Sequence, residues 1–253
     1  MTDIDYLLLL QDFRNSTNDF FTPFFEILSV FSVTYLVIVP AFIYWCVSRK
    51  SGLYIFASYS LSIALNAVIK LTACVYRPWI KDSRIIPAGN AVNSATGYSF
   101  PSGHTSTAVP IYGGIAMTGW KKSHTLSAIC IVCALLTAFS RNYLGVHTPQ
   151  DVAAAFFVSL ITLFVMWNLF DFLSSHPEKE NYYLLAGEIA GILALIYFSL
   201  KKFPMDYADG KLLVDPYIMQ KSGYGDIVRF MGFCAARWIE KTWIRYQPRR
   251  SRK

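Results

Sequence analysis

The chain has 253 residues, of which 54% are hydrophobic, 16% aromatic and only 15% charged. Soluble domains carry about 25% charged residues, so these charges are too few to cover a soluble globule. A disordered chain is excluded as well, because such chains are polar and poor in aromatic residues. The composition therefore predicts an integral membrane protein with aromatic residues at the bilayer interfaces. At this length we expect one helical domain.

The net charge of +7 is concentrated at the carboxyl end. Five basic residues lie among the last nine: Arg245, Arg249, Arg250, Arg252 and Lys253. A basic tail beside apolar segments is typical of a cytoplasmic anchor close to anionic lipid. Nucleic-acid binding would require a basic face interleaved with aromatic residues, and the sequence has none. We therefore expect membrane lipids, and no nucleic acid, among the partners.

All five cysteines lie in apolar stretches: Cys46, Cys74, Cys130, Cys133 and Cys234. Cys130 and Cys133 form a C-x-x-C pair, but the residues around them are aliphatic. This pattern is more typical of small residues in a membrane helix than of a redox or zinc site. We expect neither disulfides nor zinc.

Long apolar runs with few charges predict membrane-spanning helices. Six such runs form the expected core: residues 24–47, 53–75, 105–120, 125–139, 152–173 and 182–200. A seventh run at 227–246 is interrupted by Arg229, Arg237, Glu240 and Lys241, and it could instead lie along the interface as an amphipathic helix. Asp3 and Asp5 open the chain in place of a basic start, so no signal peptide is expected. The predicted fold is an all-α polytopic transmembrane bundle of six core spans with a possible seventh.

Basic residues in the short loops predict the orientation of these spans. The loops on one side contain Arg49, Lys50, Lys121, Lys122 and Lys179. By the positive-inside rule this side is cytoplasmic, and residues 1–23, the long loop 76–104 and the short loop 140–151 are extracytoplasmic. Lys201 and Lys202 are at odds with this assignment, because they follow the sixth run at its outer end.

The first of three polar clusters on the outer side contains Lys70, Arg77 and Pro78. Lys70 and Arg77 are seven residues apart, so a continuous helix would carry both cations on one face. Pro78 would then end the helix. These cations could simply reach to the head-group region, but ionisable residues inside spans are costly and often functional.

The second cluster is Phe100-Pro101-Ser102-Gly103-His104, immediately before the third run. Unpaired backbone N–H groups at a helix start form a site for phosphate. Ser102 can add a hydroxyl, Gly103 allows close approach, and His104 can hold a proton near the anion. An ordinary helix cap with an incidental histidine is the alternative.

The third cluster runs from Ser140 and Arg141 to His147 and Asp151. Thr148 before a proline is typical of a helix N-cap. Asp151 lies four residues after His147, so its carboxylate can orient the imidazole and leave the other ring nitrogen free as a base or nucleophile. A solvated His–Asp pair at a helix start is the alternative.

The order K-x6-R-P, P-S-G-H, S-R-x5-H-x3-D resembles the three-part signature of the type 2 phosphatidic acid phosphatase (PAP2) superfamily. That superfamily includes membrane lipid phosphatases, bacterial undecaprenyl pyrophosphate phosphatases and soluble vanadium haloperoxidases. The resemblance implies a phosphatase core at 24–200, preceded by an extracytoplasmic or interfacial segment at 1–23. It does not extend to the C-terminal extension, 201–253.

By this resemblance His147 is the nucleophile and carries the phosphoryl group as a phosphohistidine. Asp151 would orient His147 and stabilise the developing imidazolium. His104 would protonate the leaving oxygen and then activate the water that releases phosphate. The non-bridging oxygens would be held by Lys70, Arg77, Arg141, the Ser102 hydroxyl and the Gly103 N–H.

The three cations Lys70, Arg77 and Arg141 also predict that the reaction needs no metal and no cofactor. Phosphoryl transfer requires in-line positioning and neutralisation of the equatorial charge, and three fixed cations can supply it. Asp151 is the only acidic residue in the three clusters, so they do not resemble a metal cage.

The motifs would bind only the phosphate group, so they do not indicate which lipid carries it. Undecaprenyl pyrophosphate is favoured, because the chain is compact and its site faces outward, as in the bacterial recycling enzymes that it resembles. A glycerophospholipid phosphatase acting on phosphatidate or phosphatidylglycerophosphate is the alternative. A non-catalytic transporter or binding protein is disfavoured, since binding needs neither a His–Asp pair nor a second histidine, and the spans argue against a haloperoxidase. Loop 79–100 is expected to set specificity.

Overall fold

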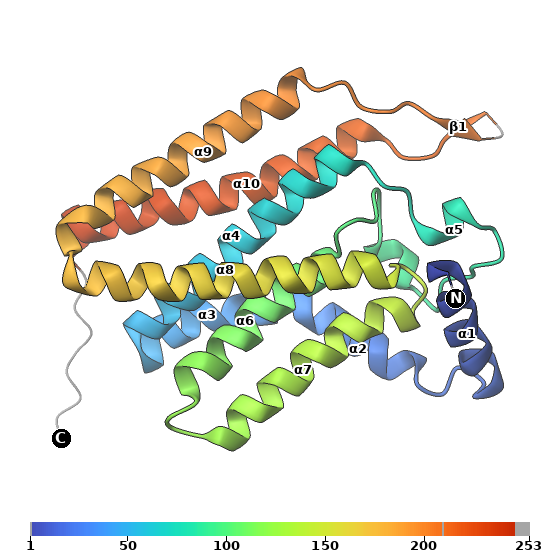
Figure 1. Cartoon of the computed structure of the whole chain (residues 1–253), viewed down its shortest axis with the longest axis horizontal. Helices are drawn as coiled ribbons and strands as arrows, with labels where there is room; N and C mark the ends of the chain where they lie inside the picture. The colour runs from blue at the N-terminus through green and yellow to red at the C-terminus, as the bar shows by residue number, and fades with distance from the viewer. Residues whose placement is uncertain (1, 209, 246–253) are drawn as a thin grey trace.

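A computed structural model describes residues 2–208 and 210–245, which form a bundle of long helices (Figure 1). The α-helices are α1 (Asp3–Ser16), α2 (Thr22–Thr34), α3 (Val39–Phe42), α4 (Arg49–Ala73), α5 (Pro78–Lys81), α6 (Gly103–Gly119), α7 (His124–Tyr143), α8 (Pro149–Ser175), α9 (Glu180–Leu200) and α10 (Pro216–Ile239). Shorter 3-10 or π segments are η1 (Leu36–Ile38), η2 (Ile43–Val47), η3 (Ala91–Ser94), η4 (Pro177–Lys179) and η5 (Glu240–Ile244). Between α9 and α10, strands β1 (Tyr207–Ala208) and β2 (Lys211–Leu212) pair antiparallel.

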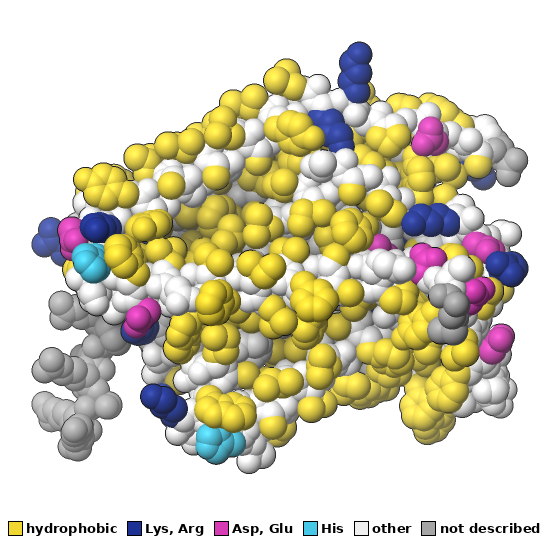
Figure 2. All heavy atoms as spheres, in the orientation of Figure 1, with side chains coloured by type: hydrophobic (Ala, Val, Ile, Leu, Met, Phe, Trp, Pro, Cys, Tyr) yellow, Lys and Arg dark blue, Asp and Glu magenta, His cyan; other side chains and the backbone are white. Residues whose placement is uncertain are grey.

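Five segments of the described chain are long and apolar enough to cross a membrane: Thr22–Val47, Arg49–Lys81, His124–Tyr143, Pro149–Ser175 and Pro177–Leu200. Figure 2 shows apolar side chains over the long sides of the bundle, with most charged side chains near its two ends. On α8, for example, Ile161 and Phe164 are 62% and 68% exposed, which is costly in water and favourable in lipid. The chain is an all-α membrane protein.

Helix α6, the expected third span, has 17 residues and lies at the centre of the bundle, packed against α4, α7 and α8. The close approach of α6 to α4 requires glycine at position 114, because a Cβ atom there would lie 2.8 Å from Ile55 Cγ1 of α4. Neighbouring helices also tolerate Pro110 inside α6. The first turn of α6 is therefore held rigidly at one end of the bundle.

The run at 24–47 is not the single helix that its continuous hydropathy suggests. Helix α2 ends at Thr34, and η1, α3 and η2 follow in turn. Pro40, in the first turn of α3, has no N–H to donate to the preceding turn, so a regular α-helix cannot continue through it. Its second half, α3 and η2, packs against α4, whereas α2 packs against α6 and α7.

Helix α10 differs from the run expected at 227–246, because it begins earlier, at Pro216, after Asp215 caps it. It packs along α4 and α9, and Gly223 brings its backbone directly onto Leu71 of α4. Although α10 packs within the bundle, it is not among the five described segments that are long and apolar enough to cross a membrane. Residue 246 and the basic residues 249–253 lie outside the described residues.

Candidate phosphate-binding site

Lys70 ties α4 to the segment that leads into α6. Its Nζ donates to the carbonyl oxygens of Tyr98, Ser99 and Pro101 at 3.2, 3.1 and 2.6 Å. An ammonium group has three donors, and all three are used here. The first polar cluster is therefore fixed against the second at the outer end of α4.

Arg77 lies near Lys70, but the two residues are not on one continuous helix, as their seven-residue spacing suggested. Helix α4 ends at Ala73, Cys74 adopts a left-handed conformation with φ 50°, and Arg77 is extended. Because a residue before proline avoids the α-helical region, Arg77 cannot continue the helix. Its guanidinium instead donates across the loop, to Gly97 O at 3.1 Å and Val146 O at 2.9 Å.

His147 is buried between a carboxylate and a guanidinium. Arg77 Nη1 lies 2.8 Å from His147 Nε2, and Asp151 Oδ2 lies 3.3 Å from His147 Nδ1. A guanidinium can only donate, so Nε2 carries the lone pair and the ring proton faces Asp151. Burial and the positive charge of Arg77 lower the pKa of His147 well below its usual value, so the imidazole is neutral.

Asp151 is held in place by the start of α8. As the sequence predicts, Thr148 is the N-cap, and Asp151 completes a capping box by accepting from Thr148 N at 2.8 Å. The same Oδ2 atom accepts from the Ser99 hydroxyl at 2.5 Å. Sequence reasoning missed Ser99, whose only signal is a small hydroxyl residue two positions before the proline of P-S-G-H.

Ser102 has the capping role that was the alternative reading of its motif. Its hydroxyl oxygen accepts from Thr105 N at 3.4 Å and from the Thr105 hydroxyl at 2.9 Å. Its own N–H donates to Asp151 O at 3.0 Å, which joins α6 to α8. At Gly103 an added Cβ would meet nothing within 4 Å, so there is open space beside the helix start.

Two buried side chains of the site retain unpaired polar atoms. His104 Nε2 has no hydrogen-bond partner among the described residues, and neither do Nε and Nη2 of Arg141. Arg141 is fully buried, and its remaining Nη1 donates to the Ser29 hydroxyl of α2. Unpaired buried donors are costly, most of all charged ones, so these atoms are suited to an anionic ligand.

His147 lies in the turn that joins α7 to α8. Gly145 adopts φ 71°, a left-handed conformation that favours glycine, and the N–H groups of Val146 and His147 both donate to Arg141 O at 3.2 Å. Asn142, which sequence reasoning did not single out, donates from its side chain to His147 O at 2.9 Å. The last turn of α7, which contains Arg141, is thus tied to the turn that contains His147.

Comparison with known proteins identifies the family. The PAP2 superfamily model matches residues 51–174. Phosphatidylglycerophosphatase B of Bacillus subtilis is 30% identical over 54% of this chain and 67% of its own length. Undecaprenyl-diphosphatase BcrC of the same organism is 30% identical over 50% of this chain and 61% of its own length.

An archaeal relative, the undecaprenyl-diphosphatase of Sulfolobus acidocaldarius, is 31% identical over 42% of this chain and 49% of its own length. The matched region thus spans about half to two thirds of these relatives. No solved structure matches the chain significantly. The segment matched by the family model contains all three motifs. The chain belongs to the PAP2 superfamily, and its kinship is with the phosphatases of that family.

Proposed function

We propose that this membrane protein hydrolyses a lipid phosphate or pyrophosphate through a phosphohistidine intermediate on His147. The observation that carries the proposal is the hydrogen bonding of one buried imidazole: Nδ1 faces Asp151, and Nε2 lies against Arg77. An oriented, neutral imidazole with an unprotonated Nε2 is a nucleophile once Arg77, which donates to Nε2 here, turns to bind an oxygen of the attacked phosphate.

In the first step, His147 Nε2 attacks phosphorus and the bond from phosphorus to the leaving oxygen breaks. The phosphate anion bound beside His104 stabilises the protonated form of this imidazole, which gives its proton to the leaving oxygen of the lipid alcohol or lipid monophosphate. The proton on His147 Nδ1 stays between the ring and Asp151, which balances the positive charge formed on the imidazole. His104 is then neutral and ready for the second step.

In the second step, water attacks the phosphohistidine in line with the phosphorus–nitrogen bond. His104 takes a proton from this water, the phosphorus–nitrogen bond breaks, and inorganic phosphate leaves. His147 is restored as a neutral imidazole and His104 as the acid. Each histidine thus completes the cycle in the state in which it began.

Positive charge at the site takes the place of a metal in this proposal. Arg141 keeps two buried donors unpaired, Arg77 lies at the nucleophile, and Lys70 adds charge while it holds the loop. The start of α6 offers the Ser102 hydroxyl proton and the N–H of Gly103. Fixed donors of this kind stabilise the equatorial oxygens in phosphoryl transfer. We therefore expect metal-independent turnover.

Undecaprenyl pyrophosphate is the proposed substrate. Two of the three relatives described above are named undecaprenyl-diphosphatases, which supports it. The relative named phosphatidylglycerophosphatase B supports the alternative, a glycerophospholipid phosphate such as phosphatidylglycerophosphate or phosphatidate. A non-catalytic lipid-phosphate transporter is disfavoured, because an oriented His147–Asp151 pair is unnecessary for binding. The distribution of basic loops supports a site on the extracytoplasmic side.

Phosphate release from a lipid panel in detergent tests this function. Undecaprenyl pyrophosphate, phosphatidate and phosphatidylglycerophosphate are compared, each with and without EDTA, for the wild type and for His147→Ala. We expect release from at least one lipid, undiminished by EDTA and absent in the variant. Lipid binding without release by the wild type would favour the transporter.

A further inference from the structure

A groove beside the site opens between α2 and η3. It has a volume of about 560 Å³ and is lined by residues of α2, by η3 and Asn90, and by Arg141. This volume lies within the range of small-molecule sites, about 300–1,000 Å³. We name it the α2–η3 groove. Glu26 of α2 accepts from Asn90 N at 2.5 Å, which ties its two walls together.

The lining of the α2–η3 groove combines a cation with apolar side chains. The cation is the fully buried guanidinium of Arg141, whose Nε and Nη2 are unpaired among the described residues. The apolar side chains on α2 are Ile27, Val30 and Phe31, which are 70%, 49% and 41% exposed. The carboxylate of Glu26 also lines the groove, but it accepts from Asn90 N. An amphiphile with an anionic head and a hydrocarbon chain matches the cation and the apolar wall.

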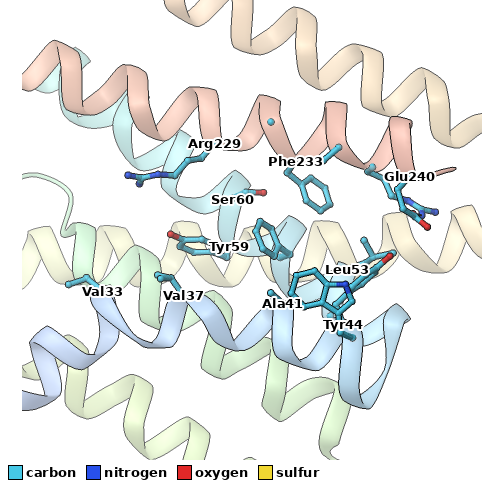
Figure 3. A pocket seen from close by; sticks show the side chains of 16 residues that line it. Val33, Val37, Ala41, Tyr44, Leu53, Tyr59, Ser60, Arg229, Phe233 and Glu240 are labelled. Carbon is cyan, nitrogen blue, oxygen red and sulfur yellow. The ribbon is translucent and has the colours of Figure 1, made fainter. Parts of the chain in front are cut away.

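A larger cavity on the other side of α2 lacks this complementarity. It has about 670 Å³ and lies between α2 and α3, α4 and α10 (Figure 3). Its lining is mainly apolar, with Ser60 and Tyr59 between Arg229 near one end and Glu240 near the other. Arg229 pairs with Asp226 at 2.6 Å, and Glu240 pairs with Arg49 and Arg237. Because these charges are matched within the protein, the cavity does not require an anion.

We infer that the α2–η3 groove holds the hydrocarbon chain of the substrate, with the phosphate at Arg141 and the chain leaving sideways along Ile27, Val30 and Phe31 into the bilayer. This inference rests on the proposed phosphatase function and adds the path of the lipid. Ser29, which lies between these apolar residues on α2, accepts a hydrogen bond from Nη1 of Arg141. This bond fixes the guanidinium, whose Nε and Nη2 remain unpaired among the described residues. Helix α2, which would contact the hydrocarbon chain, thus also positions Arg141, which would bind the phosphate.

A matched pair of substitutions on α2 tests the inference. Val30 lines the α2–η3 groove and Val33 lines the cavity of Figure 3, one turn along the same helix. Val30→Trp and Val33→Trp are compared for kcat/KM with undecaprenyl pyrophosphate and phosphatidate in micelles, and with p-nitrophenyl phosphate, which has no lipid chain. Ser94→Trp narrows the groove from its opposite wall and serves as a second variant.

We expect Val30→Trp and Ser94→Trp to lower kcat/KM for the hydrolysed lipid by about tenfold or more, since each methylene displaced from apolar contact weakens binding about fourfold. Activity on p-nitrophenyl phosphate should stay within about twofold, which also shows that the variants fold. Val33→Trp should leave both activities unchanged. A chain-dependent loss in Val33→Trp alone, an equal loss on all substrates, or no loss in the groove variants would overturn the inference.

Binding of radiolabelled undecaprenyl phosphate is measured in parallel. If the wild type binds this lipid and Val30→Trp binds it at least about tenfold more weakly, the groove assignment stands even when no phosphate is released. In that case only the proposed catalysis fails. Equal binding by both proteins would reject the groove while leaving the catalytic proposal intact.

Discussion

At the scale of single residues, one carboxylate oxygen organises the site. Asp151 Oδ2 accepts from Thr148 N and from the Ser99 hydroxyl, and it faces Nδ1 of His147. The interaction that starts α8 therefore also selects the tautomer of the imidazole. Because the helix cap and the carboxylate that faces His147 are the same group, the position of this carboxylate is fixed by the first turn of α8.

The two histidines should respond differently to removal. His147→Ala should abolish turnover of every substrate, because no covalent intermediate can form. His104→Ala should lose about 10²–10⁴-fold on a lipid but less on p-nitrophenyl phosphate, whose leaving group needs little protonation. Rapid quench with labelled substrate should find acid-labile label in His104→Ala and none in His147→Ala. Label in His147→Ala, or an identical response of both variants to the leaving group, would refute the assignment.

Ser99 should act as a positioning residue through Asp151. Ser99→Ala removes a donor to a buried carboxylate, a bond of about 1.5–3 kcal/mol, so we expect kcat to fall about tenfold with little change in KM. Ser58→Ala is the matched control, because Ser58 is equally buried and donates only to Tyr54 O in its own helix. If both substitutions lowered kcat equally, Ser99 would have only a structural role.

The low pKa of His147 has consequences for pH dependence. Since its folded pKa lies below the unfolded value of 6.5, the unfolded chain takes up this proton first as pH falls. The free energy of unfolding should therefore decline below about pH 6.5, while the nucleophile of the folded enzyme stays neutral there. The acidic limb of kcat/KM for p-nitrophenyl phosphate should lie below pH 6.5 and move to higher pH in Arg77→Met. An unshifted limb in that variant would exclude His147 as its source.

At the scale of elements, α1 braces the long loop before η3. Arg14, only 4% exposed, donates to Ile86 O at 2.6 Å and to Tyr143 O at 3.3 Å, so it joins this loop to the end of α7. Gln11 adds hydrogen bonds to Arg84 O and from Ile86 N. The segment expected at the interface is therefore a helix that holds loop 79–100 beside the phosphate site.

Removal of Arg14 should loosen this loop. Arg14→Ala removes two hydrogen bonds from a buried cation to carbonyl oxygens and its ion pair with Asp19, so we expect a loss of about 2 kcal/mol or more in the free energy of unfolding. Hydrogen exchange of the amides around Ile86 should quicken, and KM for the lipid should rise more than kcat falls. Arg84→Ala, which removes an exposed ion pair with Asp82, is the control and should change neither. Unchanged exchange in Arg14→Ala would show that α1 does not brace the loop.

At the scale of the whole molecule, the basic loops predict the orientation of the bundle in the membrane. The outer Lys201 opposed the positive-inside assignment, but its Nζ donates to Leu71 O and to Thr72 O at the last turn of α4. A cation at a helix C-terminus is favourable, because the last carbonyl groups have no intrahelical partner. Lys201 thus has a local structural role that does not bear on topology.

Labelling of single cysteines in intact cells tests the orientation. Arg84→Cys, in exposed loop 79–100, should react with a membrane-impermeant thiol reagent, whereas Lys121→Cys, between α6 and α7, should not. Reaction after permeabilisation shows that the second cysteine is accessible, and the unsubstituted chain gives the background from Cys46, which is exposed. The reverse labelling would place the site on the cytoplasmic side.

The sequence by itself determined the features that depend on local order along the chain. Hydropathy located the long helices at 125–139, 152–173 and 182–200 to within a few residues, because burial in lipid needs only a continuous apolar run. The H-x3-D spacing determined the contact between His147 and Asp151, because four residues at a helix start bring the two side chains together.

Tertiary structure decided the features that join distant segments. The spacing of Lys70 and Arg77 suggested one helix, but Cys74 ends α4, and the two cations meet the site through carbonyl groups of residues 96–101 and 146. Ser99 reaches Asp151 across 52 residues, and Ser29 reaches Arg141 across 112. Hydroxyl groups carry no hydropathy or spacing signal for such contacts. Only the packing of α2, α4 and α6 around the turn that precedes α8 determines which of them meet the site.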